Sequence, residues 1–346
     1  MIDVGLIGFG LAGRAFHAQV IRATPGLRLA AIVQRSGNEA AEKYPDVRVV
    51  RSVGELLGIS EIRVVVIATP NETHAPIARE CLEAGRDAVV DKPFATTLAE
   101  AEALVDLAKK LGRLITVYQN RRYDGDFQAM RQIVADGVLG RIVRFETNYD
   151  RFRPELKAGA WRERSVPGAG ILFDLAPHLI DHALVLFGLP EAVAADVRVE
   201  RAAAVVDDAF DVKLHYPEGM RAVLRSTMLA AVARPRFLLH GTRGAFLKQT
   251  FDPQEINLRN GITYESEGWK SEPENDWGVV TTVEAGAEAR RSVPSAASDY
   301  RDYYANVRDA TLGKAELAIT PTHALNVMRV LEMARESSRE KRTIPW

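Results

Sequence analysis

The hydrophobic pattern in the first third of the chain alternates short β-rich runs with stretches of helical periodicity. The apolar runs predict buried strands at Asp3–Ile7, Arg28–Val33, Arg63–Ala68, Asp87–Val90 and Leu114–Tyr118. The stretches between them predict helices at Gly13–Ala23, Asn38–Tyr44, His74–Ala84 and Leu98–Leu111. Buried strands that alternate with helices indicate a parallel sheet covered on both faces. The pattern therefore predicts a doubly wound α/β domain over residues 1–120.

The pattern changes after residue 120. A helix at Asp126–Asp136 precedes a strand at Arg141–Tyr149, an irregular stretch at Arg151–Gly170 and a strongly apolar helix at Ile171–Phe187. Further strands are predicted at Ala192–Val199, Ala209–His215, Arg221–Thr227 and Arg236–Gly241. The short turns between these strands favour antiparallel neighbours.

The last part of the chain is less regular. The stretch Thr250–Ser298 is polar and predicts no clear element, and two helices at Tyr300–Leu312 and Pro321–Arg339 close the chain. We expect residues 121–346 to form an α+β domain with a large, open, mainly antiparallel sheet, whose last helix can pack back on the first domain. Because an open sheet face has to be covered, we expect a homodimer or homotetramer formed through this sheet.

Composition excludes several classes of protein. The 346 residues carry a formal net charge of -1, so neither a nucleic acid nor an anionic membrane is an expected partner. The single cysteine, Cys81, excludes an intramolecular disulfide framework and lies in a helical pattern typical of a buried thiol. No apolar run is long enough to span a bilayer, and the N-terminus has no signal-peptide pattern. We therefore expect a cytoplasmic protein.

Three glycines with the spacing G-x-G-x-x-G follow the first strand and open a helix. A dinucleotide site needs the first glycine for a tight turn and the second so that the backbone can approach a pyrophosphate. It needs the third so that the helix can pack close to the strand. We assign this turn to the cofactor, with the residues Gly8, Phe9, Gly10, Leu11, Ala12 and Gly13.

The end of the second predicted strand indicates which cofactor is bound. An NAD site of this type usually carries an acidic residue about twenty positions after the glycines, where it binds the ribose 2′-hydroxyl. Here the chain has Gln34, Arg35 and Ser36 instead, and a cation with a hydroxyl suits a 2′-phosphate. We expect NADP, with NAD as the less favoured cofactor; the alternative is that Arg35 is a solvated surface residue.

Two further turns follow predicted parallel strands at the ends that line a ligand crevice. The first contributes cofactor-binding candidates Thr69, Pro70, Asn71 and His74, although Asn71 or Thr73 can also simply cap the next helix. The second turn is Asp91-Lys92-Pro93. A lysine at the edge of an apolar strand is a candidate for acid–base chemistry, with a plain surface lysine as the alternative.

The apolar helix Ile171–Phe187 carries Asp174 and His178 one turn apart on the same face. A carboxylate beside an imidazole in an apolar helix is costly without partners or a task. His178 can take the proton of a substrate hydroxyl while Asp174 orients the ring or a neighbouring hydroxyl. A metal set of Asp174, His178 and His182 is less favoured, because one helix face seldom supplies three ligands. We interpret His182 as a structural histidine and expect no metal.

These motifs resemble the Gfo/Idh/MocA oxidoreductases, and the resemblance covers nearly the whole chain. It rests on the glycine turn, on Asp91-Lys92-Pro93 where the family has Glu-Lys-Pro, and on Asp174-x-x-x-His178. A subgroup that includes NADP-dependent scyllo-inositol 2-dehydrogenase shares further phrases. They are residues 118–124 (YQNRRYD), 152–155 (FRPE), 161–163 (WRE), 174–181 (DLAPHLID) and 337–344 (SSREKRTI).

The resemblance implies a nicotinamide-dependent dehydrogenase of a cyclic polyol or sugar, such as scyllo-inositol. It places Lys92, Asp174 and His178 at the reacting carbon. It implies further cofactor contacts from Asp91, Lys92, Asn120, Trp161 and Arg162, and substrate contacts from Lys92, Tyr149, Arg153, Asp174 and His178. Two departures are Asp91 for the usual glutamate and Ala176 for a frequent glycine. A sugar-sensing regulatory protein without turnover and an aldose dehydrogenase are the alternative functions.

Overall fold

The computed structural model describes residues 1–157 and 159–346; Ala158, within the irregular stretch Arg151–Gly170, lies outside the described residues. The chain divides into two compact units. The first unit comprises Met1–Asn120, Gln254–Lys270 and Asp299–Leu325, and the second comprises Arg121–Pro253, Ser271–Ser298 and Asn326–Trp346. Two segments that follow residue 121 therefore belong to the first unit. Most of the last helix lies in the second.

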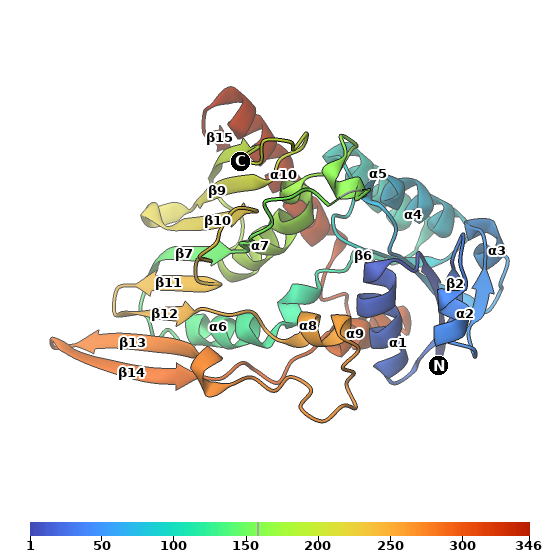
Figure 1. Cartoon of the computed structure of the whole chain (residues 1–346), viewed down its shortest axis with the longest axis horizontal. Coiled ribbons are helices and arrows are strands. Elements are labelled where there is room, and N and C mark those ends of the chain that lie inside the picture. The colour runs from blue at the N-terminus through green and yellow to red at the C-terminus, as the bar shows by residue number, and fades with distance from the viewer. Residues whose placement is uncertain (158) are drawn as a thin grey trace. The chain divides into compact units, whose positions relative to one another are not determined.

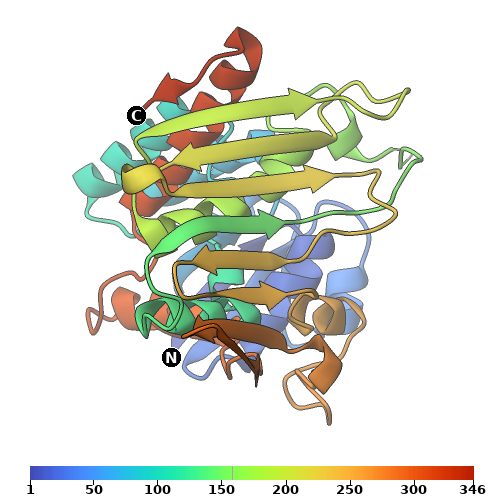
Figure 2. The same cartoon turned by 90° about the vertical axis from the view of Figure 1, so that its left-hand side faces the viewer.

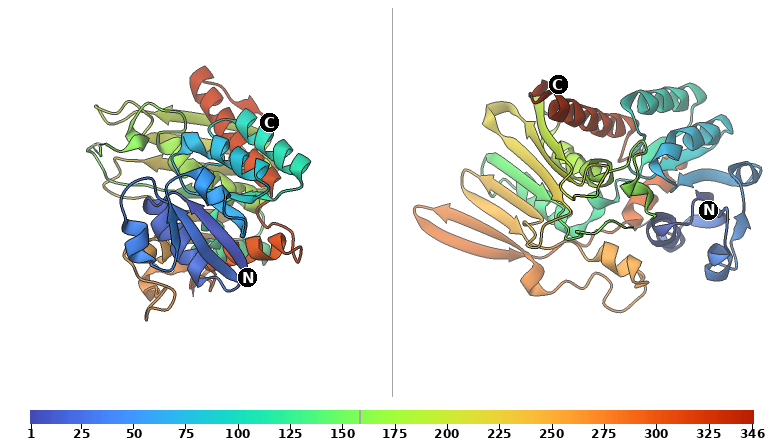
Figure 3. Two further views of the ribbon diagram at one scale, coloured as in Figure 1. Left: turned by 90° about the vertical axis from the view of Figure 1, so that its right-hand side faces the viewer. Right: turned by 45° about the horizontal axis from the view of Figure 1, so that its top comes forward.

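The first unit is built on a six-stranded sheet of order β3-β2-β1-β4-β5-β6 (Figure 3, left). The strands, all parallel, are β1 (Ile2–Ile7), β2 (Leu27–Val33), β3 (Arg48–Val50), β4 (Ile62–Ile67), β5 (Asp87–Val90) and β6 (Ile115–Val117). The doubly wound fold expected from the sequence is confirmed. The strand order reverses between β1 and β4, and in such sheets ligands bind at the carboxyl ends of the strands at that point.

The helices of the first unit include the predicted ones, with one local difference, and two short helices that the sequence did not predict, Val53–Leu57 and Gln254–Arg259. They are α1 (Gln19–Ala23), α2 (Glu39–Lys43), α3 (Val53–Leu57), α4 (His74–Glu83), α5 (Leu98–Leu111), α8 (Gln254–Arg259) and α9 (Arg301–Thr311). Thr97 and Glu100 form a capping box at the start of α5, and Gly112 ends this helix in the left-handed conformation. The difference is η1 (Gly13–Ala18), a π-helical segment that precedes α1.

The second unit contains a nine-stranded sheet of order β14-β13-β12-β11-β7-β10-β9-β8-β15 (Figure 2). Its strands are β7 (Ile142–Asn148), β8 (Ala192–Arg198), β9 (Ala209–His215), β10 (Arg221–Thr227), β11 (Phe237–Gly241), β12 (Gly244–Lys248), β13 (Gly278–Glu284), β14 (Ala287–Val293) and β15 (Ile344–Pro345). The pair β7 and β10 is parallel, and the other neighbours in the described chain are antiparallel. The large, mainly antiparallel sheet is thus confirmed.

Helices cover one face of this sheet, as Figure 1 and the right-hand view of Figure 3 show. They include α6 (Gly125–Ala135) and α7 (Ile171–Phe187), and α10 (Pro321–Glu340) closes the unit near one sheet edge. At that edge the Ser337 and Ser338 hydroxyls accept hydrogen bonds from the amides of Ala195 and Val197 in β8, at 2.9 and 2.8 Å. The closing helix therefore supplies hydrogen-bond partners to the part of β8 that the two-residue edge strand β15 does not pair with.

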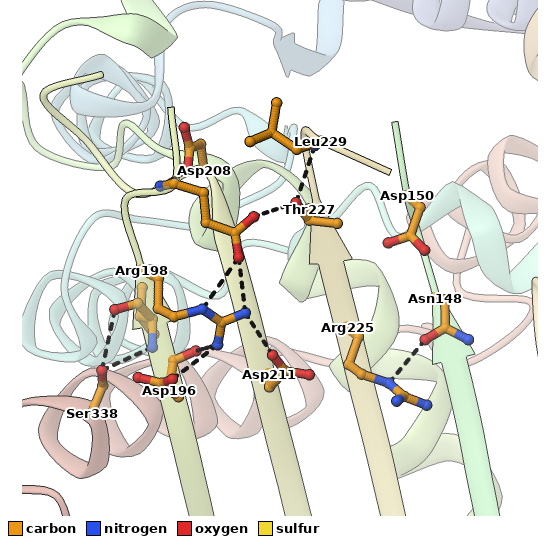
Figure 4. A network of polar contacts seen from close by, with 12 residues as sticks. Asn148, Asp150, Asp196, Arg198, Asp208, Asp211, Arg225, Thr227, Leu229 and Ser338 are labelled. Atoms are coloured by element: carbon orange, nitrogen blue, oxygen red, sulfur yellow. Dashed lines mark hydrogen bonds and ion pairs between the residues drawn. The ribbon is translucent and has the colours of Figure 1, made fainter. Parts of the chain in front are cut away.

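The other face of the sheet is polar (Figure 4). Arg198 in β8 lies 2.9 Å from Asp196 and 2.8 Å from Asp211 in β9, and Arg225 in β10 forms an ion pair with Glu146 in β7. The face of the sheet opposite the helices therefore carries charged side chains that are paired within the chain. None of the helices in residues 1–157 and 159–346 is long and apolar enough to cross a membrane.

Candidate active site

The glycine turn has the geometry that each of its glycines predicts. Gly8 has a φ of +100°, a conformation that favours glycine. A Cβ atom on Gly13 would lie 2.0 Å from the Gly8 carbonyl oxygen, so only glycine permits this close helix–strand contact. A Cβ atom on Gly10 would meet nothing within 4 Å. The backbone at Gly10 is thus open for the approach of a pyrophosphate, and the turn fits a dinucleotide.

The loop after β2 holds the residues predicted to choose between NAD and NADP. Arg35 and Ser36 are exposed, while the Gln34 side-chain oxygen accepts a hydrogen bond from the Ala40 amide at 2.9 Å. Arg51, at the end of β3, donates to the carbonyls of Gln34 and Gly37 at 3.0 and 2.7 Å. The loop is therefore braced from a neighbouring strand, and its cation and hydroxyl remain available to solvent.

The turn after β4 is tied to the turn after β5 by a buried histidine. His74 Nδ1 lies 2.8 Å from the Pro93 carbonyl oxygen, and Nε2 lies 3.0 Å from the Thr69 carbonyl oxygen. Burial lowers the pKa of His74, which favours the neutral ring. Thr73 does not cap α4 with its side chain, because its hydroxyl donates to Pro70 at 2.7 Å. Both ring nitrogens of His74 thus face the main chain, so this residue is suited to fixing the crevice turns.

Lys92 occupies the turn directly after β5 and is half-buried, which argues against a plain surface lysine. Its amide donates to Asp91 Oδ1 at 2.8 Å, and its peptide bond to Pro93 is cis. Burial by itself would raise the pKa of Asp91, but the neighbouring His17 and Lys92 bring it below its usual value. An ionised Asp91 therefore holds the main chain of Lys92. Asn120, the last residue of the first of the three segments that form this unit, is buried.

In the second unit, α7 presents Asp174 and His178 as the sequence predicts. His178 is buried, and Asp174 is half-buried. The Asp174 carboxylate lies 3.4 Å from Arg151 and 3.3 Å from Arg162. Two guanidinium groups next to one carboxylate favour its ionised form, so Asp174 is suited to accept hydrogen bonds from substrate hydroxyls.

The N-terminus of α7 is fixed by a residue distant in sequence. The Asp207 carboxylate accepts a hydrogen bond from the Leu172 amide at 2.7 Å, and the Asp207 carbonyl accepts one from Ile171 at 2.9 Å. Gly170 has a φ of +88°, and a Cβ atom there would lie 2.2 Å from the Asp207 carboxylate. This close approach requires a glycine immediately before the helix.

Further along α7, Asp181 and His182 contact Arg122 and Arg121, the first residues of the second unit. Asp181 accepts two hydrogen bonds of 2.6 Å from Arg122. His182 lies 3.2 Å from the Arg121 carbonyl oxygen and stacks on Phe127 with a centroid distance of 4.2 Å. Burial and then the nearby arginines keep the pKa of His182 well below its usual value. His182 is thus a neutral ring packed in the interior, as a structural histidine would be.

The other predicted substrate residues lie in contrasting surroundings. Tyr149 is buried, and its hydroxyl accepts a hydrogen bond from Arg121 at 2.8 Å. The Arg151 guanidinium lies 4.8 Å from the centre of the Tyr149 ring, which suits a cation–π contact. Arg153 is exposed. Tyr149 therefore supports the arginine that contacts Asp174.

The segment η4 (Trp161–Glu163) carries two of the predicted cofactor residues. Arg162 lies over the ring of Trp161 at 4.5 Å, and Glu163 accepts a hydrogen bond from Arg201 at 2.9 Å. Arg201 also forms an ion pair with Asp208 at 2.8 Å. This pairing anchors an otherwise irregular segment to the loop after β8.

Sequence reasoning missed several residues that position the candidate site residues of the first and the second unit. They are His17, Arg51, Arg151, Arg201 and Asp207. Each acts on a residue far away in the sequence, so no local spacing identifies it. Only His17 carried a signal, since it follows the glycine turn within the same helical pattern. In the described ranges, no group of three or more His, Cys, Asp or Glu residues is arranged to hold a metal ion.

Two protein-family models match the chain. The model "Oxidoreductase family, NAD-binding Rossmann fold" matches residues 2–119, and "Oxidoreductase family, C-terminal alpha/beta domain" matches residues 131–346. With the parallel sheet and the glycine turn, they define an NAD(P)-dependent oxidoreductase that acts on CH–OH groups. The chain belongs to the Gfo/Idh/MocA family, so the resemblance seen in the sequence motifs is confirmed.

Individual relatives match over almost the full length. The oxidoreductase YdgJ of Escherichia coli (strain K12) is 42% identical over 343 residues, covering 99% of this chain and 98% of its own. The scyllo-inositol 2-dehydrogenase (NADP(+)) IolW of Bacillus subtilis (strain 168) is 34% identical over 343 residues, covering 99% of this chain and 95% of its own. The solved structure of the oxidoreductase yvaA from Bacillus subtilis has a TM-score of 0.96 at 34% identity, covering 100% of this chain and 98% of that one.

Proposed function

We propose that this protein is an NADP-dependent dehydrogenase of a cyclic polyol or sugar, with an inositol such as scyllo-inositol as the favoured substrate. The observation that carries the proposal is the pair of acid–base groups: Lys92 directly after β5, and His178 beside an arginine-paired Asp174 on α7. The NADP-dependent inositol dehydrogenase among the relatives supports the same substrate class.

In the proposed reaction, this chain positions a secondary hydroxyl and removes its proton. When bound, NADP supplies the hydride acceptor, and the carbon of the alcohol becomes a ketone. Asp174, held between Arg151 and Arg162, accepts hydrogen bonds from neighbouring hydroxyls and so orients the ring of the substrate. His178 and Lys92 handle the proton of the reacting hydroxyl. The reduction of a ketone uses the same groups in reverse.

The cofactor residues have separate tasks in the proposal. The turn from Gly8 to Gly13 holds the pyrophosphate, and Arg35 with Ser36 binds the 2′-phosphate. Thr69, Pro70 and Asn71 border the cofactor, together with Asn120. Trp161 and Arg162 complete the predicted contacts, as the resemblance implies.

A homodimer or homotetramer remains part of the proposal. The polar face of the large sheet, with Arg198, Asp211 and Arg225, is the surface we assign to it. In such an interface, charged groups would contribute more to the specificity of the association than to its affinity.

A substrate screen tests the proposed function. The purified protein is incubated with inositols and aldoses and with NADP or NAD, and the reduced cofactor is followed by its absorbance. We expect turnover of an inositol with NADP. Turnover of an aldose but of no inositol would identify an aldose as the substrate. Cofactor binding without turnover of any polyol or sugar would indicate a regulatory protein and overturn the proposal.

A further inference from the structure

A buried cluster of polar aromatic and acidic side chains adjoins the Lys92 turn in the first unit. Its members are His17 in η1, Asp91 after β5, Tyr118 after β6 and Tyr304 in α9. His17 is 0% exposed. Its Nδ1 lies 2.6 Å from the Tyr304 hydroxyl oxygen, and its Nε2 lies 3.8 Å from Asp91 Oδ2. The Tyr304 hydroxyl thus contacts one side of the His17 ring, and the other side of the ring faces the Asp91 carboxylate.

The Asp91 carboxylate that faces His17 Nε2 favours one direction for the hydrogen bond between His17 and Tyr304. Burial raises the pKa of Tyr304 well above its usual value, so its hydroxyl keeps its proton and is able to donate to His17 Nδ1. A neutral imidazole that accepts at Nδ1 carries its proton on Nε2. Nε2 is the nitrogen that faces Asp91. The ring therefore presents an N–H group to the carboxylate that holds Lys92.

Packing holds the His17 ring in this orientation. The Tyr118 ring lies against it with a centroid distance of 4.3 Å, and the Tyr118 hydroxyl donates to the Phe16 carbonyl at 2.9 Å. Phe16 and His17 both lie in η1, the π-helical segment. A π-helix departs from the ordinary ladder of main-chain hydrogen bonds and is frequent at functional sites. The segment that follows the glycine turn thus also orients His17.

We propose that His17 and Tyr304 are positioning residues for Lys92: they hold the Asp91 carboxylate, which in turn holds the Lys92 main chain. The Lys92 amide donates to Asp91 Oδ1, while Asp91 Oδ2 faces His17. The two oxygens of one carboxylate therefore connect the imidazole to the main chain of the lysine. This inference rests on the proposed function, in which Lys92 handles the proton of the substrate hydroxyl.

Kinetics of two conservative variants test the proposal. Tyr304→Phe keeps the ring and removes the hydroxyl, and Asp91→Asn keeps the size and removes the charge. We expect each to lower kcat by about 10-fold, less than the roughly 10²-fold that a 1 Å displacement can cost. The KM values for cofactor and polyol should stay close to wild type. Asp91→Glu, which retains the carboxylate, should recover most of kcat.

Tyr44→Phe is the matched control in the same unit. Its buried hydroxyl has no hydrogen-bond partner in the described chain, so the variant should keep the wild-type kcat. Wild-type kcat in both Tyr304→Phe and Asp91→Asn would overturn the proposal. A parallel change of kcat, KM and Tm in these variants would indicate a merely structural role and would also overturn it.

A second readout does not depend on turnover. Nitrogen NMR of isotope-labelled histidine, with His17→Gln to assign the resonance, reports which ring nitrogen carries the proton. We expect the Nε2-protonated form in the wild type and a changed resonance in Tyr304→Phe. A neutral ring protonated on Nδ1 would overturn the array. If the wild type turns over no polyol, the proposed function fails, while this measurement still decides the direction of the hydrogen bonds.

Discussion

The ion pair between Arg122 and Asp181 supports the sharpest stability prediction. Arg122 donates two hydrogen bonds of 2.6 Å to the Asp181 carboxylate, and the side chains are only 12% and 2% exposed. In Arg122→Met the stem remains but the buried carboxylate loses its bidentate partner. Breaking such a buried pair costs about 3–5 kcal/mol, so the free energy of unfolding should fall by that amount.

A double-mutant cycle separates the pair from general damage to α7. Replacing both partners, as Arg122→Met with Asp181→Leu, leaves no unpaired charge and should recover most of the lost stability. The exposed pair Arg290 and Glu288 is the control, because Arg290→Met should change stability by no more than about 1 kcal/mol. Urea unfolding followed by circular dichroism measures all variants. A loss below about 1 kcal/mol in Arg122→Met, or a double variant as unstable as the single one, would refute this reasoning.

Two further predictions concern pH and the cofactor. Burial lowers the pKa of His182 well below the unfolded value of about 6.5, so the unfolded state binds the extra proton and stability falls as the pH drops below that value. Between about pH 7.5 and 5.5 the free energy of unfolding should fall by about 1.4 kcal/mol because of His182. His182→Gln should remove this pH dependence, as measured by urea unfolding. An equal pH dependence in the wild type and the variant would contradict the prediction. Arg35→Ala should lower kcat/KM for NADP by about 10- to 100-fold, because it removes a charged hydrogen bond to the 2′-phosphate. The value of kcat/KM for NAD should stay nearly unchanged. An equal loss for both cofactors would exclude Arg35 as the residue that binds the 2′-phosphate.

The elements that the sequence predicts well are those whose pattern is dictated locally. The glycine turn is an example, because a φ of +100° at Gly8 and the tight contact of Gly13 both demand glycine. The helices α7 and α5 are others, because they have the bounds that their patterns predict, Ile171–Phe187 and Leu98–Leu111. In each case the residues that define the element are neighbours in the sequence. The fold class followed from segments of this kind, and the family resemblance followed from short motifs such as the glycine turn and Asp91-Lys92-Pro93.

The elements that the sequence did not predict depend on distant partners. β3 has three residues, and β14 exposes polar side chains along its length, so neither shows an apolar run. Both exist because a neighbouring strand supplies hydrogen bonds. The Asp207 cap of α7 and the arginines at Asp174 are likewise long-range contacts. Their residue types are ordinary, and only the fold brings them to the candidate site.

The same limit applies to the segments that join the first unit. Gln254–Lys270 and Asp299–Leu325 follow the second set of strands in the sequence, yet they belong with the Rossmann sheet. The physical reason is visible in α9, where Tyr303 and Tyr304 pack on Tyr118 with centroid distances of 4.8 and 5.6 Å. A helical pattern predicts that α9 exists, but it does not name the surface that α9 covers.

The most direct test of the account is the turnover of Lys92→Met and His178→Asn, measured with NADP and an inositol that the wild type oxidises. Positioned acid–base groups contribute about 10²–10⁴-fold to the rate, so kcat should fall by a factor in this range in each variant. NADP binding, measured by fluorescence, should remain close to wild type in His178→Asn. Near-normal kcat in both variants would contradict the assignment of these two residues to the proton of the substrate hydroxyl.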